Sequence, residues 1–116
     1  MSNNAIALTD LNYLKTTCGG SEEMVNQIVN MFLESTPELI SEMKTSLDEE
    51  NWEVLKRNAH KAKSSFLMIG AKITGKKLER IELGVETPKL ANLSDLVSEV
   101  ENESDYIFNE LKNTLT

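Results

Sequence analysis

The sequence predicts an all-α fold, namely an antiparallel up-down-up-down four-helix bundle with a short additional helix at the N-terminus. Three observations lead to this prediction. Apolar residues recur at helical spacings of three and four along most of the chain. The 116 residues include only 5 Gly and 2 Pro that would interrupt a helix. The segments between helices are short, which favours antiparallel neighbours. We expect one domain over residues 1–116, with its bundle core at about 8–112.

The first helix is short and has a clear stop signal. Leu8, Leu11 and Leu14 stand at helical spacing, so they define one apolar face. Gly19 and Gly20 follow, and consecutive glycines are typical of the left-handed turn that ends a helix. We therefore expect the chain to leave this helix before residue 19.

A second, longer helix begins after Ser21, whose hydroxyl can cap its first turn. Glu22 and Glu23 follow in that turn, where the helix dipole favours acidic side chains. Pro37 lacks the amide donor that a helix interior needs, so we expect it to kink the helix or to split it in two. The apolar positions of this helix include Met24, Ile28, Phe32, Leu39, Met43 and Leu47.

Three more helices complete the predicted bundle. Asn51 is the expected N-cap of the third helix, with Asp48 as the alternative. The fourth helix runs from about residue 72 to 85 and stops before Pro88, because proline cannot continue a helix. The fifth helix starts near Asn92 or Ser94, and its apolar positions are Leu93, Leu96, Val100, Ile107, Leu111 and Leu115.

Composition and charge exclude several classes of protein. The net charge of −7 argues against a nucleic-acid partner, because phosphate backbones attract basic surfaces. The single cysteine, Cys18, rules out an internal disulfide and a cysteine-based zinc site. No apolar run approaches the roughly 20 residues that a membrane span requires. The first residues resemble no secretory signal, so we expect a cytoplasmic protein or a soluble piece of a larger one. We also expect a monomer that does not bind membranes.

The basic residues gather in one region of this acidic chain. Residues 56–80 contain eight of the 12 basic residues and a single acidic one, Glu79, while the rest of the chain is strongly acidic. The only histidine, His60, lies inside this region. On charge alone, the cluster is typical of a solvated helix surface. Its basic members are Lys56, Arg57, Lys61, Lys63, Lys72, Lys76, Lys77 and Arg80.

The third helix has a buried face and an opposite face that carries His60. At about 100° per residue, His60 lies more than about 120° from the centre of the apolar stripe, so it points to solvent or to a partner. Met68 lies at one side of this outer face, and Lys61 lies further round. The apolar stripe consists of Trp52, Leu55, Ala59, Ala62, Phe66, Ile69 and Ile73, all expected in the core. The outer face holds Lys56, Lys63, Ser64, Leu67 and Ala71 beside His60.

Several activities can be set aside for an exposed helical histidine. One histidine without a second His or a set of Cys falls short of the usual zinc ligand count. No strand-turn-helix element accompanies it, as a hydrolytic triad would require. No glycine-rich phosphate loop occurs, so we expect no ATP site.

Phosphoryl chemistry suits the neighbours of His60. A neutral imidazole is a competent nucleophile near pH 7. Lys63 at i+3 lies on the same face and can neutralise part of the charge of a phosphoryl group. Ser64 at i+4 is small and leaves the ring accessible, and its hydroxyl can bond a phosphoryl oxygen. Leu67 and Met68 supply apolar surface that a partner helix can cover.

The stretch from residue 59 to 71 resembles the signature of the histidine-containing phosphotransfer (Hpt) domain family. The resemblance extends over about residues 8–112, and includes Asn51-Trp52 at the start of the third helix and Leu78-Glu79 in the fourth. Phe66 and Ala62 depart from the family pattern, and the larger Phe66 is expected to fill the space that Ala62 leaves. The positions that match the signature are His60, Lys63, Ser64, Gly70 and Ala71.

This resemblance implies that His60 carries a phosphoryl group between receiver-domain aspartates, as a carrier without autokinase activity. The implied partners are receiver domains of response regulators or hybrid histidine kinases. The receiver supplies Mg²⁺, so no cofactor is expected in this chain. Lys63 and Ser64 would assist His60. The residues expected to dock the receiver are Lys56, Leu67, Met68 and Ala71.

The resemblance also implies a polar contact to His60 from the fourth helix. A count along the sequence nominates Glu82, with Arg80 or Lys76 as alternatives. A carboxylate at this position would orient the imidazole ring but would repel a phosphoryl group. Two other functions stay open, a receiver-docking module without catalysis and the phosphoacceptor domain of a chemotaxis-type histidine kinase.

Overall fold

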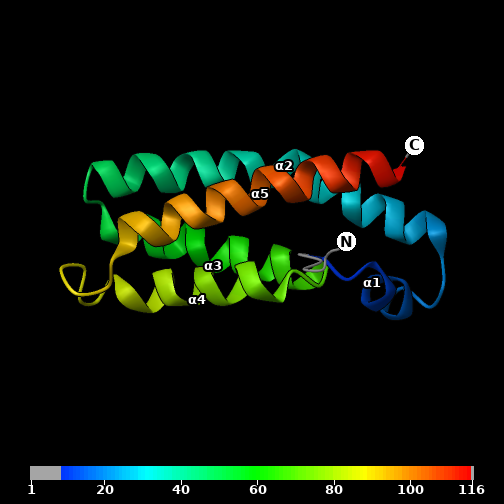
Figure 1. The fold of residues 1–116 in the computed structure, drawn as a ribbon, viewed down its shortest axis with the longest axis horizontal. Helices are drawn as coiled ribbons and strands as arrows, with labels where there is room; N and C mark the ends of the chain where they lie inside the picture. The colour runs from blue at the N-terminus through cyan, green and yellow to red at the C-terminus, as the bar shows by residue number, and fades with distance from the viewer. Residues whose placement is uncertain (1–8, 116) are drawn as a thin grey trace, which may run out of the picture.

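The computed structural model describes residues 9–115, for 114 and 115 by backbone alone, and all regular structure in this range is helical. Figure 1 shows α2 beside α5 on one side of the molecule, α3 and α4 on the other, and α1 at one end. Successive long helices run in opposite directions, so the predicted all-α bundle with a short N-terminal helix is confirmed. The helices are α1 (Leu11–Thr17), α2 (Glu22–Asp48), α3 (Trp52–Met68), α4 (Lys72–Gly84) and α5 (Leu93–Leu115).

The long helices α2 and α3 begin at side-chain caps. The hydroxyl of Ser21 accepts a hydrogen bond from the amide of Met24 at 3.2 Å. The side-chain oxygen of Asn51 accepts one from the amide of Val54 at 3.4 Å, so Asn51, and not Asp48, is the N-cap of α3. Each cap satisfies an amide that the first helical turn leaves without a partner.

The first helix ends as the glycines predict. Gly19 and Gly20 have φ angles of +65° and +82°, in the left-handed region that glycine adopts without strain. Leu14 is fully buried and attaches α1 to the bundle. Leu8, which we expected on the same face, lies outside the described residues.

The helix α2 runs unbroken through Pro37, so of the two effects expected of this proline, a kink or a split, the split is wrong. Its buried face also includes polar positions that a count of apolar residues omits, Thr36 and Ser46. Met24 is 48 % exposed and lies off this face. Ile28, Leu39 and Leu47 are partly buried at its edge. The buried residues of α2 are Val25, Val29, Phe32, Thr36, Ile40, Met43 and Ser46.

The turn between α3 and α4 corrects two expectations. Gly70 has a φ angle of +78°, and the amides of Gly70 and Ala71 donate to the carbonyls of Leu67 and Phe66 at 3.0 and 2.9 Å. These bonds form a Schellman motif, in which the residue after the glycine turns back onto the helix end. Ala71 is therefore fully buried and cannot contact a partner. The apolar stripe of α3 does not continue past this turn, so Ile73 is 44 % exposed.

The same turn anchors the segment before α1. The amide of Asp10 donates to the carbonyl of Ile69 at 3.2 Å. A Cβ atom placed on Gly70 would lie 2.6 Å from the Cβ of Asp10, so no larger residue fits without displacing this segment. Glycine is thus required here for its backbone conformation and for the close approach.

The rest of the predicted face of α3 is in the core. Phe66 is fully buried, and its ring meets that of Phe32 edge-on, with centroids 4.9 Å apart and planes at 87°. Trp52 is partly buried at the edge of the core. No helix in the described part of the chain is both long and apolar enough to cross a membrane. The other buried members of the predicted stripe are Leu55, Ala59, Ala62 and Ile69.

Candidate functional site

His60 lies on the side of α3 that faces away from the core, with 60 % of its side chain exposed. The preceding residue, Ala59, is fully buried, so the helix itself orients the imidazole outward. On the flank of the ring next to α4, Nδ1 lies 2.7 Å from Oε2 of Glu82. The fourth-helix contact to His60 is thus made by a carboxylate.

Glu82 also joins His60 to Lys63. Its second oxygen, Oε1, accepts a hydrogen bond from Nζ of Lys63 at 2.9 Å. The side chains of Glu82 and Lys63 are only 16 % and 19 % exposed, in contrast to the open imidazole. Glu79, one turn earlier on α4, is 4.0 Å from the same Nζ. The carboxylate of Glu82 is therefore held from both sides in a fixed position.

The charges of this cluster determine where the imidazole proton lies. Burial raises the pKa of Glu82, but hydrogen bonds from Lys63 and His60 outweigh burial and leave that pKa below its usual 4.5. The hydrogen bond to Glu82 in turn raises the pKa of Lys63. Because an ionised carboxylate only accepts hydrogen bonds, Nδ1 of His60 carries a proton and donates a hydrogen bond to Oε2 of Glu82. In the neutral ring, Nε2 then holds a free lone pair.

Apart from the buried Ala71, the other residues that the sequence placed on this face of α3 are exposed. The hydroxyl of Ser64 donates a hydrogen bond at 3.4 Å to the backbone carbonyl of His60, which lies one turn earlier in the same helix. Lys56 forms an ion pair with Glu86 at 3.0 Å. Leu67 is 41 % exposed, and Met68 is half exposed.

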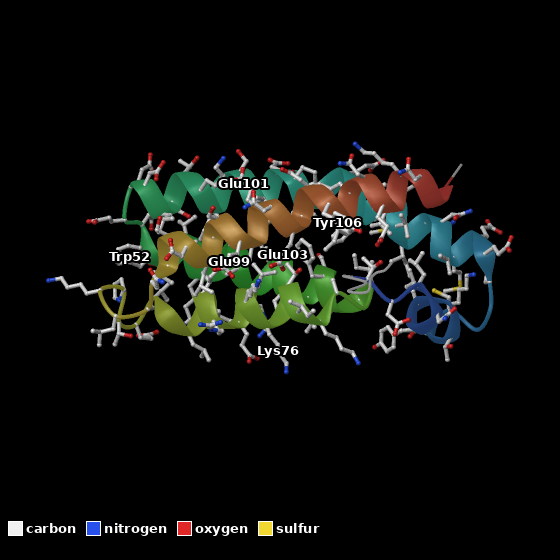
Figure 2. All side chains as sticks on the ribbon, in the orientation of Figure 1. Trp52, Lys76, Glu99, Glu101, Glu103 and Tyr106 are labelled. Carbon is white, nitrogen blue, oxygen red and sulfur yellow. The ribbon has the colours of Figure 1, made fainter. Side chains whose placement is uncertain are left out.

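The two alternatives to Glu82 lie elsewhere on α4. Arg80 and Lys76 are both exposed, and neither contacts His60 in the described structure. Figure 2 shows Lys76 pointing away from the bundle. The structure therefore selects Glu82 among the three candidates.

An apolar groove of about 400 Å³ between α2 and α3 begins one helical turn from His60. Met31 of α2 borders it and is 67 % exposed. We did not predict this residue, although its spacing of seven from the exposed Met24 was a signal for a second methionine on the outer side of α2. The groove is lined by Ile28, Met31, Phe32, Ser35, Ser64, Ser65, Met68 and Ile69.

Chemically, the cluster presents a nucleophilic nitrogen with its proton held on the opposite side of the ring. Nε2 belongs to an exposed ring, so a second protein can reach it. Lys63 supplies a positive charge within one turn of it. Apolar surface lies next to it, at Leu67 and along the groove. These are the elements of a group-transfer site that acts on another macromolecule.

Comparison with known proteins assigns a family to the chain. The model of the Hpt domain family matches residues 27–114, which is most of the chain and includes α3, α4, most of α2 and nearly all of α5. Neither the comparison with curated proteins nor that with solved structures found a match. An Hpt domain has a histidine phosphotransfer role in phosphorelay, and such domains exchange phosphoryl groups with receiver domains. The chain belongs to the Hpt domain family.

Proposed function

We propose that His60 carries the phosphoryl group, which it takes from the aspartyl phosphate of one receiver domain and passes to an aspartate of another. The observation that supports this most strongly is the hydrogen bond of 2.7 Å between Nδ1 and Glu82 on an otherwise exposed ring. It leaves Nε2 free to react. His60 is also the only histidine that this chain can use.

The proposed transfer begins with the lone pair of Nε2. It attacks the phosphorus atom of the aspartyl phosphate, and an N–P bond forms. The P–O bond to the aspartate breaks, and its electron pair leaves with the receiver carboxylate. The proton on Nδ1 stays on the ring, where the positive charge that develops faces the carboxylate of Glu82. The reverse sequence returns the phosphoryl group to a receiver.

Lys63 and Glu82 have opposite effects on the phosphoryl group. Lys63 attracts its oxygens, whereas the carboxylate of Glu82 repels them. Glu82 contacts the ring through Nδ1, on the side away from Nε2, and Lys63 neutralises its other oxygen at 2.9 Å. Glu82 therefore orients the ring while its repulsion is reduced. Ser64 can turn its hydroxyl from the His60 carbonyl toward a phosphoryl oxygen.

The receiver domain would cover the apolar surface around His60. We place its contacts on Leu67, Met68 and the groove that Met31 borders, with Lys56 at the rim. Mg²⁺ and the reacting aspartate would belong to the receiver, so the chain contributes the nucleophile, its orientation and the docking surface. We therefore also propose that the chain acts with its receivers in the cytoplasm.

The decisive experiment is phosphorylation of the wild type and of His60→Gln by a phosphorylated receiver domain. The variant should take up no phosphoryl group. The variant can lose one hydrogen bond to Glu82, so its free energy of unfolding should fall by at most about 1.5 kcal/mol, and both proteins are compared well below their melting temperatures. The label on the wild type should be acid-labile and base-stable, as a phosphoramidate is. Equal labelling of His60→Gln with the same stability would refute the proposal.

A further inference from the structure

The bundle separates its charges between two pairs of helices. The helices α2 and α5, which lie side by side in Figure 1, contain twelve acidic and two basic residues. The helices α3 and α4 contain eight basic and three acidic residues. The acidic and the basic residues therefore predominate on opposite sides of the molecule.

Part of the positive charge on α3 and α4 is neutralised locally. Lys56 pairs with Glu86, Lys63 with Glu82, and Lys77 with Glu99 at 3.0 Å and with Glu103. Three basic residues of α4 have no acidic partner within the described residues. These are Lys72, Lys76 and Arg80, which we call the basic ridge.

The basic ridge follows one exposed face of α4. Its members are four residues apart, so they lie above one another on the helix surface. Like charges at this spacing repel one another and weaken a helix. The acidic residues of α4, Glu79 and Glu82, are both within 4.0 Å of Lys63 on the side toward α3, and neither forms an ion pair with the ridge among the described residues. The ridge therefore presents its three positive charges to solvent or to a partner.

We propose that the basic ridge is an electrostatic docking surface for the acidic face of the partner receiver domain. This inference rests on the proposed function. A receiver site that binds Mg²⁺ and presents an aspartate is built from carboxylates, because Mg²⁺ takes oxygen ligands. Such a face is attracted by the ridge, on the helix that also supplies Glu82 to His60, and is repelled by the acidic residues of α2 and α5. The part of α2 that borders the apolar groove presents uncharged residues, Ile28, Met31, Phe32 and Ser35, so docking there is compatible with this repulsion. The charge separation turns the basic side toward the incoming partner.

An attraction between exposed charges changes the rate at which two proteins associate more than it changes the rate of the chemical step. Exposed charges raise the association rate and are screened by salt, with a screening length of about 10 Å at about 0.1 M and about 3 Å at about 1 M. The ridge should therefore contribute to the second-order transfer rate at low salt. It should contribute little to the transfer rate within a saturated complex, because no ridge residue contacts His60 in the described structure.

The test compares two triple variants that each remove three positive charges. The first is Lys72→Gln/Lys76→Gln/Arg80→Gln, in the ridge. The matched control, Lys15→Gln/Lys89→Gln/Lys112→Gln, changes exposed lysines outside α3 and α4. Glutamine has nearly the same helix propensity as lysine and arginine, so both variants should fold, which circular dichroism checks. The probe is a response-regulator receiver domain phosphorylated with acetyl phosphate and Mg²⁺.

At about 0.1 M salt, the ridge variant should show a second-order transfer rate about 10-fold below wild type, and the control a change of less than about threefold. At about 1 M salt the second-order transfer rates of the two variants should become equal. Equal losses in both variants, or a loss that persists at high salt, would overturn the inference. If the wild type accepts no phosphoryl group, the proposed function fails, and the association rate of the unphosphorylated receiver, measured by stopped flow, still tests the ridge.

Discussion

Glu82 illustrates how one residue is kept charged in a poorly solvated position. Only 16 % of its side chain is exposed, and burial alone would favour the protonated acid. Two donors on opposite sides, Lys63 and His60, reverse this preference. The carboxylate therefore depends on both neighbours, and its charge is linked to the stability of the fold.

The first prediction concerns the pH dependence of this link. Because the pKa of Glu82 is lower in the folded protein, its charge stabilises the fold above the usual 4.5, and this contribution is lost as pH falls through the lowered value. Glu82→Gln should thus be less stable than wild type at pH 7, and the difference should shrink at about pH 3. Urea unfolding at both pH values measures the difference in the free energy of unfolding between the variant and the wild type. A difference that stays constant with pH would contradict the assignment, and the exposed Glu79→Gln serves as control.

The second prediction separates Lys63 from its neighbour Lys61. Negative charge develops on the phosphoryl oxygens during transfer, and Lys63 is the basic residue one turn from His60. Lys63→Ala should slow single-turnover transfer from one phosphorylated receiver by about 10- to 100-fold without abolishing it. Lys61→Ala is the control, because Lys61 is exposed and forms no ion pair among the described residues. If all three proteins react at one rate, Lys63 has no role in the site.

The residues of the site were predictable to different degrees. The outward direction of His60 followed from the apolar spacing within its own helix, and the exposed ring confirms it. To choose Glu82 over Arg80 with certainty, one must know how α4 is oriented about its own axis relative to α3. Residues 80 and 82 are separated by about 200° around a helix, so only one of them can face α3. The count along the sequence nominated Glu82, and the structure shows its contact with His60. Arg80 and Lys76 could be set aside only with the rotation of α4, which the packing of both helices sets.

At the scale of one helix, the two faces of α3 have different roles. Substitutions at two adjacent residues, Phe66 and Leu67, can distinguish these roles. Phe66 is fully buried against Phe32, so Phe66→Ala should lower the free energy of unfolding by about 3–5 kcal/mol. Leu67 is 41 % exposed, so Leu67→Ala should cost far less and should instead weaken receiver binding. Urea unfolding and a binding titration measure the two effects. The opposite ranking of stabilities would show that the faces are assigned incorrectly.

Helix boundaries were easier to predict than the faces on either side of them. Ser21 and Asn51 cap α2 and α3 because their side chains bond local amides, an effect of nearby sequence. Ala71 and Ile73 were misplaced because the stripe of α3 was continued across Gly70. A glycine directly after an apolar helix end is itself the signal of a Schellman turn. Past such a turn, the helical phase restarts.

At the scale of the whole molecule, a polar network joins the basic α4 to the acidic α5. Figure 2 shows Glu99 and Glu103 on the side of α5 toward α4, and Glu101 on the side toward α2. Glu103 accepts a hydrogen bond from the buried hydroxyl of Thr74 at 2.7 Å and another from Lys77. The hydrogen bond to Glu103 raises the pKa of Lys77 above its usual 10.5, so Lys77 stays protonated near neutral pH. This network fixes α4, and with it Glu82, against the other half of the bundle.

The last prediction tests whether this network supports the fold or the chemistry. Glu103 is 16 % exposed and holds a buried hydroxyl, so Glu103→Gln should lower the free energy of unfolding by about 1–2 kcal/mol. Glu101→Gln is the matched control, since the ion pair of Glu101 within the described part of the chain is with the exposed Lys44, and its loss should matter much less. Both variants should transfer phosphoryl groups at near wild-type single-turnover rates well below their melting temperatures, because neither residue contacts His60. A slow but fully folded Glu103→Gln would instead show that the anchoring of α4 sets the position of Glu82 during transfer.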